Sequence, residues 1–260
     1  MDSSCQARLP LKSTLKPSLG GLEHPERLLG LRQDRLLSTD AIFISLDLEV
    51  ASDRKRLLRS GKRPDITQIG FARLDTRDLC SLPISSSSDL RRFIAVRYFQ
   101  VTALSLSKSA QAKRRKVCVF AEPTKIKQHQ IPSVITRSLQ IRDRSREDGS
   151  LRSVVLVGPS VKGDLKIIQH LDIQLFETAP IYTAIDTYLL ARYILPPYSL
   201  DISLQPGQKF TLAGILSALG CRPNTSNFHN AGNDAAYTIY VMLLLAVQHA
   251  TGRAAELKFE

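Results

Sequence analysis

The chain has 260 residues, 43% of them hydrophobic, with a net charge of +12 and an isoelectric point near 9.8. One large domain with a buried core is therefore possible, and the excess of Lys and Arg favours a polyanionic partner such as nucleic acid. The four cysteines, Cys5, Cys80, Cys118 and Cys221, form no CxxC pair, which argues against a zinc cluster or a disulfide framework. The longest apolar run, residues 240–247, is far shorter than the roughly 20 residues of a membrane span, so we expect an intracellular protein of the cytoplasm or nucleus.

The first elements in chain order predict an antiparallel meander. Residues 1–39 show no sustained hydrophobic period and are expected to form a poorly ordered basic arm. Residues 41–50, 66–74 and 92–101 are β-branched and apolar runs typical of strands. The Ser-rich segment 75–89 suits a hairpin connection between the second and third of them, and three strands joined in this way form a meander.

Alternating helices and strands follow an irregular, basic segment at residues 102–130. Strands are expected at 153–158 and 180–185, and helices at 133–144, 163–171, 187–193, 211–219 and 230–249. Asp186 is a suitable N-cap for the helix at 187–193, Gly220 would stop the helix at 211–219, and the last helix carries an apolar stripe at helical spacing. This order predicts an α/β fold in which a mixed five-stranded sheet, an antiparallel meander plus parallel strands, is flanked by helices. It also predicts one domain over residues 40–255, with basic insertions near 51–65 and 102–130.

Two carboxylates lie on the first predicted strand. Asp47 and Glu49 are two residues apart, so the strand period of two places them on one face. Apolar residues fill the alternate positions, which predicts that the opposite face is buried. A solvated strand end would explain the two acids alone, but this strand is too apolar for the surface. Carboxylates that share a face repel each other unless a cation lies between them.

Three further polar residues stand at the ends of later elements. Asp164 opens the helix after the strand at 153–158, where open sheets place their sites, although the helix dipole alone can explain an acid in a first turn. His229 precedes the last helix and Asp234 lies in its first or second turn. The small residues between them would let the helix approach a sheet closely, while ordinary Asn-Gly turn chemistry is the alternative interpretation.

In chain order, these segments resemble the motifs of a known enzyme family. Three segments are similar to the three motifs of DEDDh-type 3′–5′ exonucleases, a branch of the proofreading exonucleases in the ribonuclease H-like superfamily. They are Asp47-Leu48-Glu49, Asp164 within VGPSVKGDL, and HNAGNDA from His229 to Ala235. Supporting matches are ITQIGFARLD, IDTYLLAR and FTLAGILSALG. The resemblance covers about residues 41–250, and the chain also resembles a group of fungal domains with this fold. The chain departs from the family at Pro159-Ser160, where a His-Asn pair is frequent, and in residues 51–65 and 102–119.

The resemblance implies a metal-dependent 3′–5′ exonuclease. Its substrate would be single-stranded nucleic acid, with RNA favoured slightly over DNA, and its products nucleoside 5′-monophosphates. Asp47, Glu49, Asp164 and Asp234 would hold two Mg²⁺ or Mn²⁺ ions, the cations that oxygen ligands favour. His229 would act as the general base of the same catalytic group.

Two basic clusters accompany these motifs. One lies between the first two predicted strands and is interpreted as a set of phosphate contacts, with a solvated loop as the alternative; it comprises Arg54, Lys55, Arg56, Arg59, Lys62 and Arg63. The other is the run KRRK at residues 113–116. Phosphate contact, a nuclear-import signal and a solvated loop all remain open for this run.

Two other functions remain open from the sequence. The first is a non-catalytic ribonuclease H-like domain that binds RNA or serves as a scaffold, although close carboxylates without a metal would repel each other. The second is an endonuclease or nucleotidyl-transfer enzyme of the same fold. Such enzymes usually lack the H-x-A-x-x-D segment, so His229 favours the exonuclease. The sequence leaves protein partners and the oligomeric state open.

Overall fold

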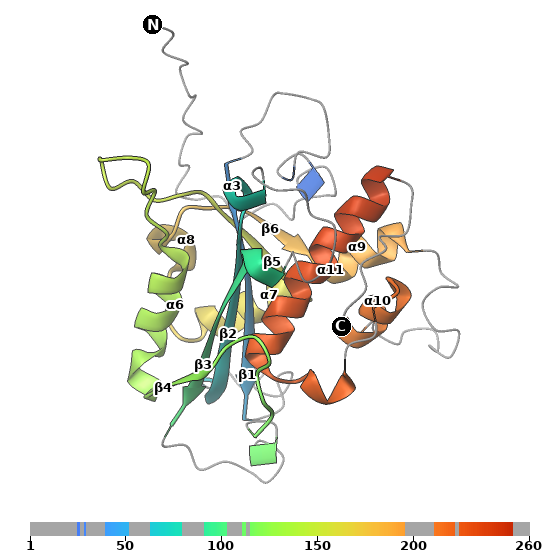
Figure 1. Cartoon of the computed structure of the whole chain (residues 1–260). Coiled ribbons are helices and arrows are strands. Elements are labelled where there is room, and N and C mark those ends of the chain that lie inside the picture. The colour runs from blue at the N-terminus through green and yellow to red at the C-terminus, as the bar shows by residue number, and fades with distance from the viewer. Residues whose placement is uncertain are drawn as a thin grey trace, which may run out of the picture.

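The computed structural model describes residues 25–26, 29, 40–51, 63–79, 91–102, 111–112, 115–195, 211–221 and 224–251. Within these residues, a central mixed sheet has helices on both faces (Figure 1). Its six described strands are β1 (Ile42–Val50), β2 (Ile66–Asp75), β3 (Ile94–Val101), β4 (Pro123–Ile126), β5 (Val154–Gly158) and β6 (Ile181–Asp186). The predicted α/β fold is confirmed, and β4 is one strand more than the sequence predicted.

The strand order is β4-β3-β2-β1-β5-β6. The first three strands form the predicted antiparallel meander, and β5 and β6 extend it in parallel from β1. The additional strand, β4, runs parallel to β3 at the sheet edge. Its sequence, PTKI, is short and exposed at three positions of four, so it carries no hydrophobic period. This explains why the segment around it was predicted to be irregular.

The described helices lie close to their predicted positions. They are α3 (Thr76–Leu79), α6 (Ile131–Leu139), α7 (Val161–Gln169), α8 (Leu175–Thr178), α9 (Thr187–Ile194), α10 (Leu212–Ala218) and α11 (Ala231–Thr251), with 3₁₀ turns η1 (Gln128–Gln130) and η2 (Thr225–Asn227). The predicted helix at 133–144 ends earlier, at Leu139, and the short helices α3 and α8 were not predicted. Two local signals act as the sequence indicated. Asp186 Oδ1 accepts the Tyr188 N–H at 3.0 Å and starts α9, while Gly220, with φ +78°, follows α10.

The sheet separates two hydrophobic clusters. Ile42, Ile44, Leu46 and Leu48 of β1 pack with α6 and α7 on one face, whereas Phe43 packs with α9, α10 and α11 on the other. The helix α11 is buried at every position from Ala231 to Ala246, although the sequence predicted only an apolar stripe along it. A helix buried on all sides is a core helix, and α11 lies directly on β1, β2 and β3.

Close packing of α11 on the sheet depends on Gly70 in β2. A Cβ atom at this position would lie 1.8 Å from the carbonyl oxygen of Ala231, far inside van der Waals contact. The absence of a side chain therefore lets the first turn of α11 rest on the sheet backbone. The predicted close approach is confirmed, and it requires a glycine on the strand as well as small residues on the helix.

Few residues of the N-terminal arm are among those described. Glu26 is buried and its carboxylate is hydrogen-bonded to His249 near the end of α11, and the Leu29 N–H donates to the Pro25 carbonyl at 2.9 Å. The rest of the arm, residues 1–24, 27–28 and 30–39, lies outside the described part of the chain. None of the helices in the described residues is long and apolar enough to cross a bilayer.

Candidate active site

The end of β1 presents two carboxylates on the face of the sheet that α11 covers. Asp47 lies opposite Gly70 of β2, and Glu49 lies opposite Gln68. Both acids are half-buried, whereas Leu46 and Leu48 are buried on the opposite face. The prediction that both carboxylates share one face is therefore confirmed.

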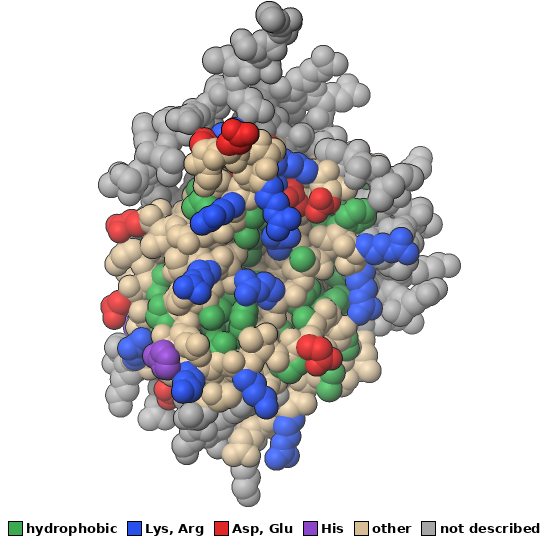
Figure 2. Space-filling view, turned by 60° about the vertical axis from the view of Figure 1, so that its left-hand side comes forward, with side chains coloured by type: hydrophobic (Ala, Val, Ile, Leu, Met, Phe, Trp, Pro, Cys, Tyr) green, Lys and Arg blue, Asp and Glu red, His purple; other side chains and the backbone are tan. Residues whose placement is uncertain are grey.

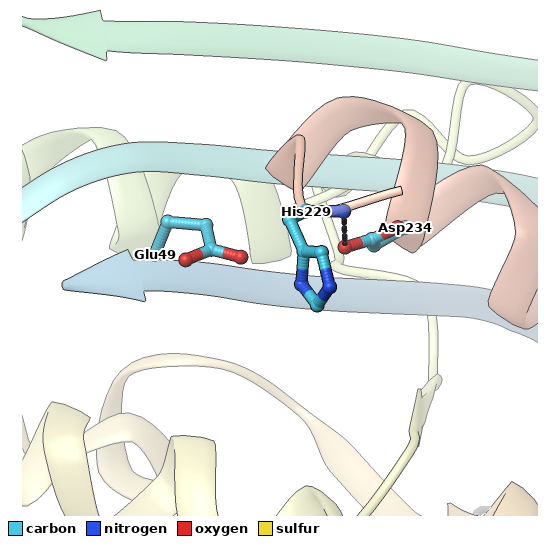
Figure 3. Close-up of side chains that lie close together, drawn as sticks. All are labelled: Glu49, His229 and Asp234. Carbon is cyan, nitrogen blue, oxygen red and sulfur yellow. Dashed lines mark hydrogen bonds between the residues drawn. The ribbon is translucent and has the colours of Figure 1, made fainter. Parts of the chain in front are cut away.

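The loop before α11 brings a histidine to these acids. Figure 3 shows Glu49, His229 and Asp234 together, with the His229 backbone N–H donating to Asp234 Oδ2 at 2.9 Å. The Ala231 N–H donates to Gln68 Oε1 at 3.0 Å, which fastens the loop to β2. As a result, Glu49, His229 and Asp234 each offer a ligand atom, and these atoms lie within 4.8 Å of one another.

Asp164 reaches the same region from another element. It lies in the first turn of α7, is only 2% exposed, and α7 packs on β1, β5 and β6. Burial first, and then the carboxylates of Asp47, Asp234, Asp186 and Asp164, raise the pKa of the Tyr188 hydroxyl to about 12. The negative charges of acids from all three motifs therefore act on Tyr188.

The sequence did not single out Tyr188. The available signal was its place in IDTYLLAR, directly after the helix cap Asp186, in a segment that served only as a supporting match. Tyrosine at the start of a helix is ordinarily explained by packing, and the ring does contact the hydrophobic cluster under α11. Only the fold brings the hydroxyl within the electrostatic influence of these carboxylates.

The arrangement fits a divalent cation. Within the described residues, Glu49, His229 and Asp234 form a group of possible metal ligands, and Asp47 and Asp164 are not members of this group. Carboxylate oxygens are ligands that Mg²⁺ and Mn²⁺ prefer. Carboxylates brought this close repel each other, and a cation between them relieves that repulsion.

The basic cluster predicted to bind phosphate lies mostly outside the described residues. Arg63, just before β2, is exposed, while Arg54, Lys55, Arg56, Arg59 and Lys62 are not described. Their role stays a prediction. Figure 2 shows further Lys and Arg side chains spread over the side where α6 lies. Exposed Arg97 of β3 reaches this helix, since its guanidinium lies 3.4 Å from Ser138 Oγ.

Comparisons with known proteins place this geometry in context. A DEDDh family model, described as "DNA polymerase III subunit epsilon-like, C-terminal domain", matches residues 42–245. The zinc-bound complex of Escherichia coli exonuclease I with single-stranded DNA aligns with a TM-score of 0.49 and 13% identity, over 82% of this chain and 42% of that one. The RNase domain of yeast Pop2 aligns with a TM-score of 0.47 and 14% identity, over 88% and 81%. The chain thus spans less than half the length of exonuclease I, and no curated protein sequence matches it.

Proposed function

Because this chain belongs to the DEDDh exonuclease family of the ribonuclease H-like superfamily, we propose that it is a metal-dependent 3′–5′ exonuclease. Its substrate is single-stranded nucleic acid, with RNA slightly favoured over DNA, and its products are nucleoside 5′-monophosphates. The observation that carries the proposal is the meeting of Glu49, His229 and Asp234 within 4.8 Å. These residues come from the first and third motifs, at opposite ends of the domain sequence.

In the proposed mechanism, Asp47, Glu49, Asp164 and Asp234 would hold two divalent ions, Mg²⁺ or Mn²⁺. When bound, such ions lower the pKa of the attacking water and stabilise the charge that develops on the phosphate oxygens. His229 accepts the proton of that water on a ring nitrogen, as a general base. Its side chain is exposed, so the ring is open to the substrate and to solvent.

Asp234 has two tasks in this scheme. One oxygen, Oδ2, accepts the His229 backbone N–H at 2.9 Å, and the same carboxylate belongs to the group of possible metal ligands. A single side chain therefore couples the cation site to the backbone that carries the base. The hydroxyl of Tyr188, on which the charges of these acids act, is a further donor that could hydrogen-bond to a phosphate oxygen.

Digestion of a 5′-labelled single-stranded RNA and its DNA equivalent tests the proposal directly. The wild-type protein should produce a ladder that shortens from the 3′ end in Mg²⁺ or Mn²⁺, and Asp47→Ala should produce none. Tight binding of both strands without cleavage would instead favour the non-catalytic RNA-binding domain. Cleavage of a circular strand would favour an endonuclease.

A further inference from the structure

Residues 116–119, which begin at the last residue of the KRRK run, lie against the loop that carries His229. Lys116 Nζ donates to the carbonyl oxygen of Phe228 at 2.6 Å, and Asn230 Nδ2 donates to the carbonyl oxygen of Lys116 at 3.0 Å. Phe228 and Asn230 are the residues directly before and after His229. The segment 116–119, called the strap below, is therefore bonded to the chain on both sides of the histidine.

Asn233 makes the remaining hydrogen bonds between the strap and this loop. Its Oδ1 accepts the Val119 N–H at 2.8 Å, and its Nδ2 donates to the carbonyls of Val117 and Asn227, both at 2.9 Å. The residue is fully buried. A buried amide whose oxygen and nitrogen are both bonded favours one arrangement of its partners, because any other leaves polar groups without hydrogen bonds.

The strap also packs closely on the first turn of α11. A Cβ atom at Gly232 would lie 2.6 Å from Cys118 Sγ and 3.0 Å from Tyr98 Cβ. A side chain at this position would push Cys118 and Tyr98 away from α11. The contact and the hydrogen bonds thus join residues 116–119 to the segment that contains both His229 and Asp234.

His229 depends on such support because of its own conformation. Its φ angle is +61°, in the left-handed region that is strained for a residue other than glycine. The side chain is exposed, so packing around the ring does not hold it in place. The position of the imidazole therefore follows from the backbone, which Asp234 and the strap hold by hydrogen bonds.

We propose that Lys116 and Asn233 are positioning residues that hold the His229 loop in its catalytic conformation. The proposal rests on the proposed function, since it assigns the strap to the general base of the exonuclease. It also gives Lys116 a task different from phosphate contact or nuclear import. A positioning residue acts on turnover, because general-base catalysis requires the ring within hydrogen-bond reach of the water.

The variants Lys116→Met and Arg115→Met separate positioning from phosphate binding. Both replace a cation by an apolar side chain, and Arg115 is the exposed neighbour of Lys116 in the same basic run, so it is a matched control. Lys116→Met should lower kcat about tenfold with KM unchanged, and Arg115→Met should leave kcat unchanged. A rise in KM of similar size in both variants, with a weaker salt dependence, would overturn the proposal in favour of phosphate contact.

Hydrogen exchange of the peptide spanning residues 225–235 gives a readout that needs no activity. Its amides should exchange faster in Lys116→Met, and faster still in Asn233→Ala, than in the wild-type and Arg115→Met proteins. Unchanged exchange in Lys116→Met would overturn the proposed role of the strap, even if exonuclease activity is confirmed. If the wild-type protein degrades no substrate, the proposed function fails. The exchange rates alone then decide whether the strap holds the His229 loop in place. If Asn233→Ala does not fold, the exchange rates of Lys116→Met by themselves test the role of the strap.

Discussion

The carboxylates near the two ends of β1 have opposite kinds of neighbours, arginines at the start of the strand and further acids at its other end. At its start, Arg152 donates to Asp75 at 2.5 and 2.9 Å and to Asp40 at 2.5 Å. Arg77 donates to Asp40 at 2.5 Å and to Asp143 at 2.9 and 3.0 Å. Three acids and two arginines from separate parts of the chain thus form one network, called the arginine network below.

At its other end, β1 carries Asp47 and Glu49 toward Asp234 and His229. Chemically identical carboxylates therefore serve different purposes at the two ends. In the arginine network, the hydrogen bond from Arg77 holds the pKa of Asp143 well below its usual range, with help from Ser145. At the candidate active site, carboxylates lie near other carboxylates, and a bound cation would offset their mutual repulsion. The comparison predicts that changes at one end alter turnover and changes at the other alter stability.

Asp234→Asn should have the largest effect on turnover. The amide oxygen of Asn can still accept the His229 N–H, but the negative charge is lost, so kcat should fall on the order of 10³-fold. The melting temperature should stay equal or rise, because one of several close carboxylates is removed. Kinetics on the labelled strand and thermal unfolding check both expectations. Wild-type turnover in Asp234→Asn would refute the site assignment.

His229→Asn should have the next largest effect. Asn tolerates a positive φ better than most residues, so the loop should keep its conformation while the base is lost, and kcat should fall about 10²-fold. Calorimetric titration with Mn²⁺ should show unchanged affinity. A large loss of Mn²⁺ affinity would instead identify the imidazole as a metal ligand, a possibility that its closeness to Glu49 and Asp234 allows.

Arg152→Met should affect stability and leave the site unchanged. Arg152 is 6% exposed and binds both Asp40 and Asp75, so its loss should lower the free energy of unfolding by about 3 kcal/mol. Urea denaturation measures this change, and kcat of the folded protein should equal that of the wild type. The matched control is Arg144→Met, an exposed arginine of the same connection, which should change stability by less than about 0.5 kcal/mol. Equal effects of the two variants would contradict the structural role of the arginine network.

Acid should weaken the arginine network by a smaller amount. Because Arg77 lowers the pKa of Asp143 in the folded protein, the stabilisation is fully present above the unfolded value of about 3.9 and is lost as pH falls toward the folded value. Arg77 is 39% exposed, so solvent screening limits the contribution to about 1 kcal/mol. Asp143→Asn should therefore lose less stability than the wild type between pH 5 and the acid limit of folding, as measured by urea denaturation. An identical pH dependence of the two proteins would show that this pair contributes nothing.

The sequence alone determined the features that depend on neighbouring residues. The period of two in β1 placed Asp47 and Glu49 on one face, and Asp186 and Gly220 marked the start of α9 and the end of α10. The order of the three motifs identified the family. These signals are local, since strand alternation, helix capping and motif spacing involve residues only a few positions apart.

Only the tertiary structure decided which distant residues meet. Nothing near Gly70 in the sequence shows that Ala231 rests on it, and nothing near Lys116 shows that its ammonium binds the carbonyl beside His229. The same holds for Tyr188, on whose hydroxyl the charges of acids from all three motifs act. Such contacts arise when α11 packs into the sheet, because close packing joins segments that no local pattern relates. The sequence therefore supplied the chemical groups of the site, and packing set the distances between them.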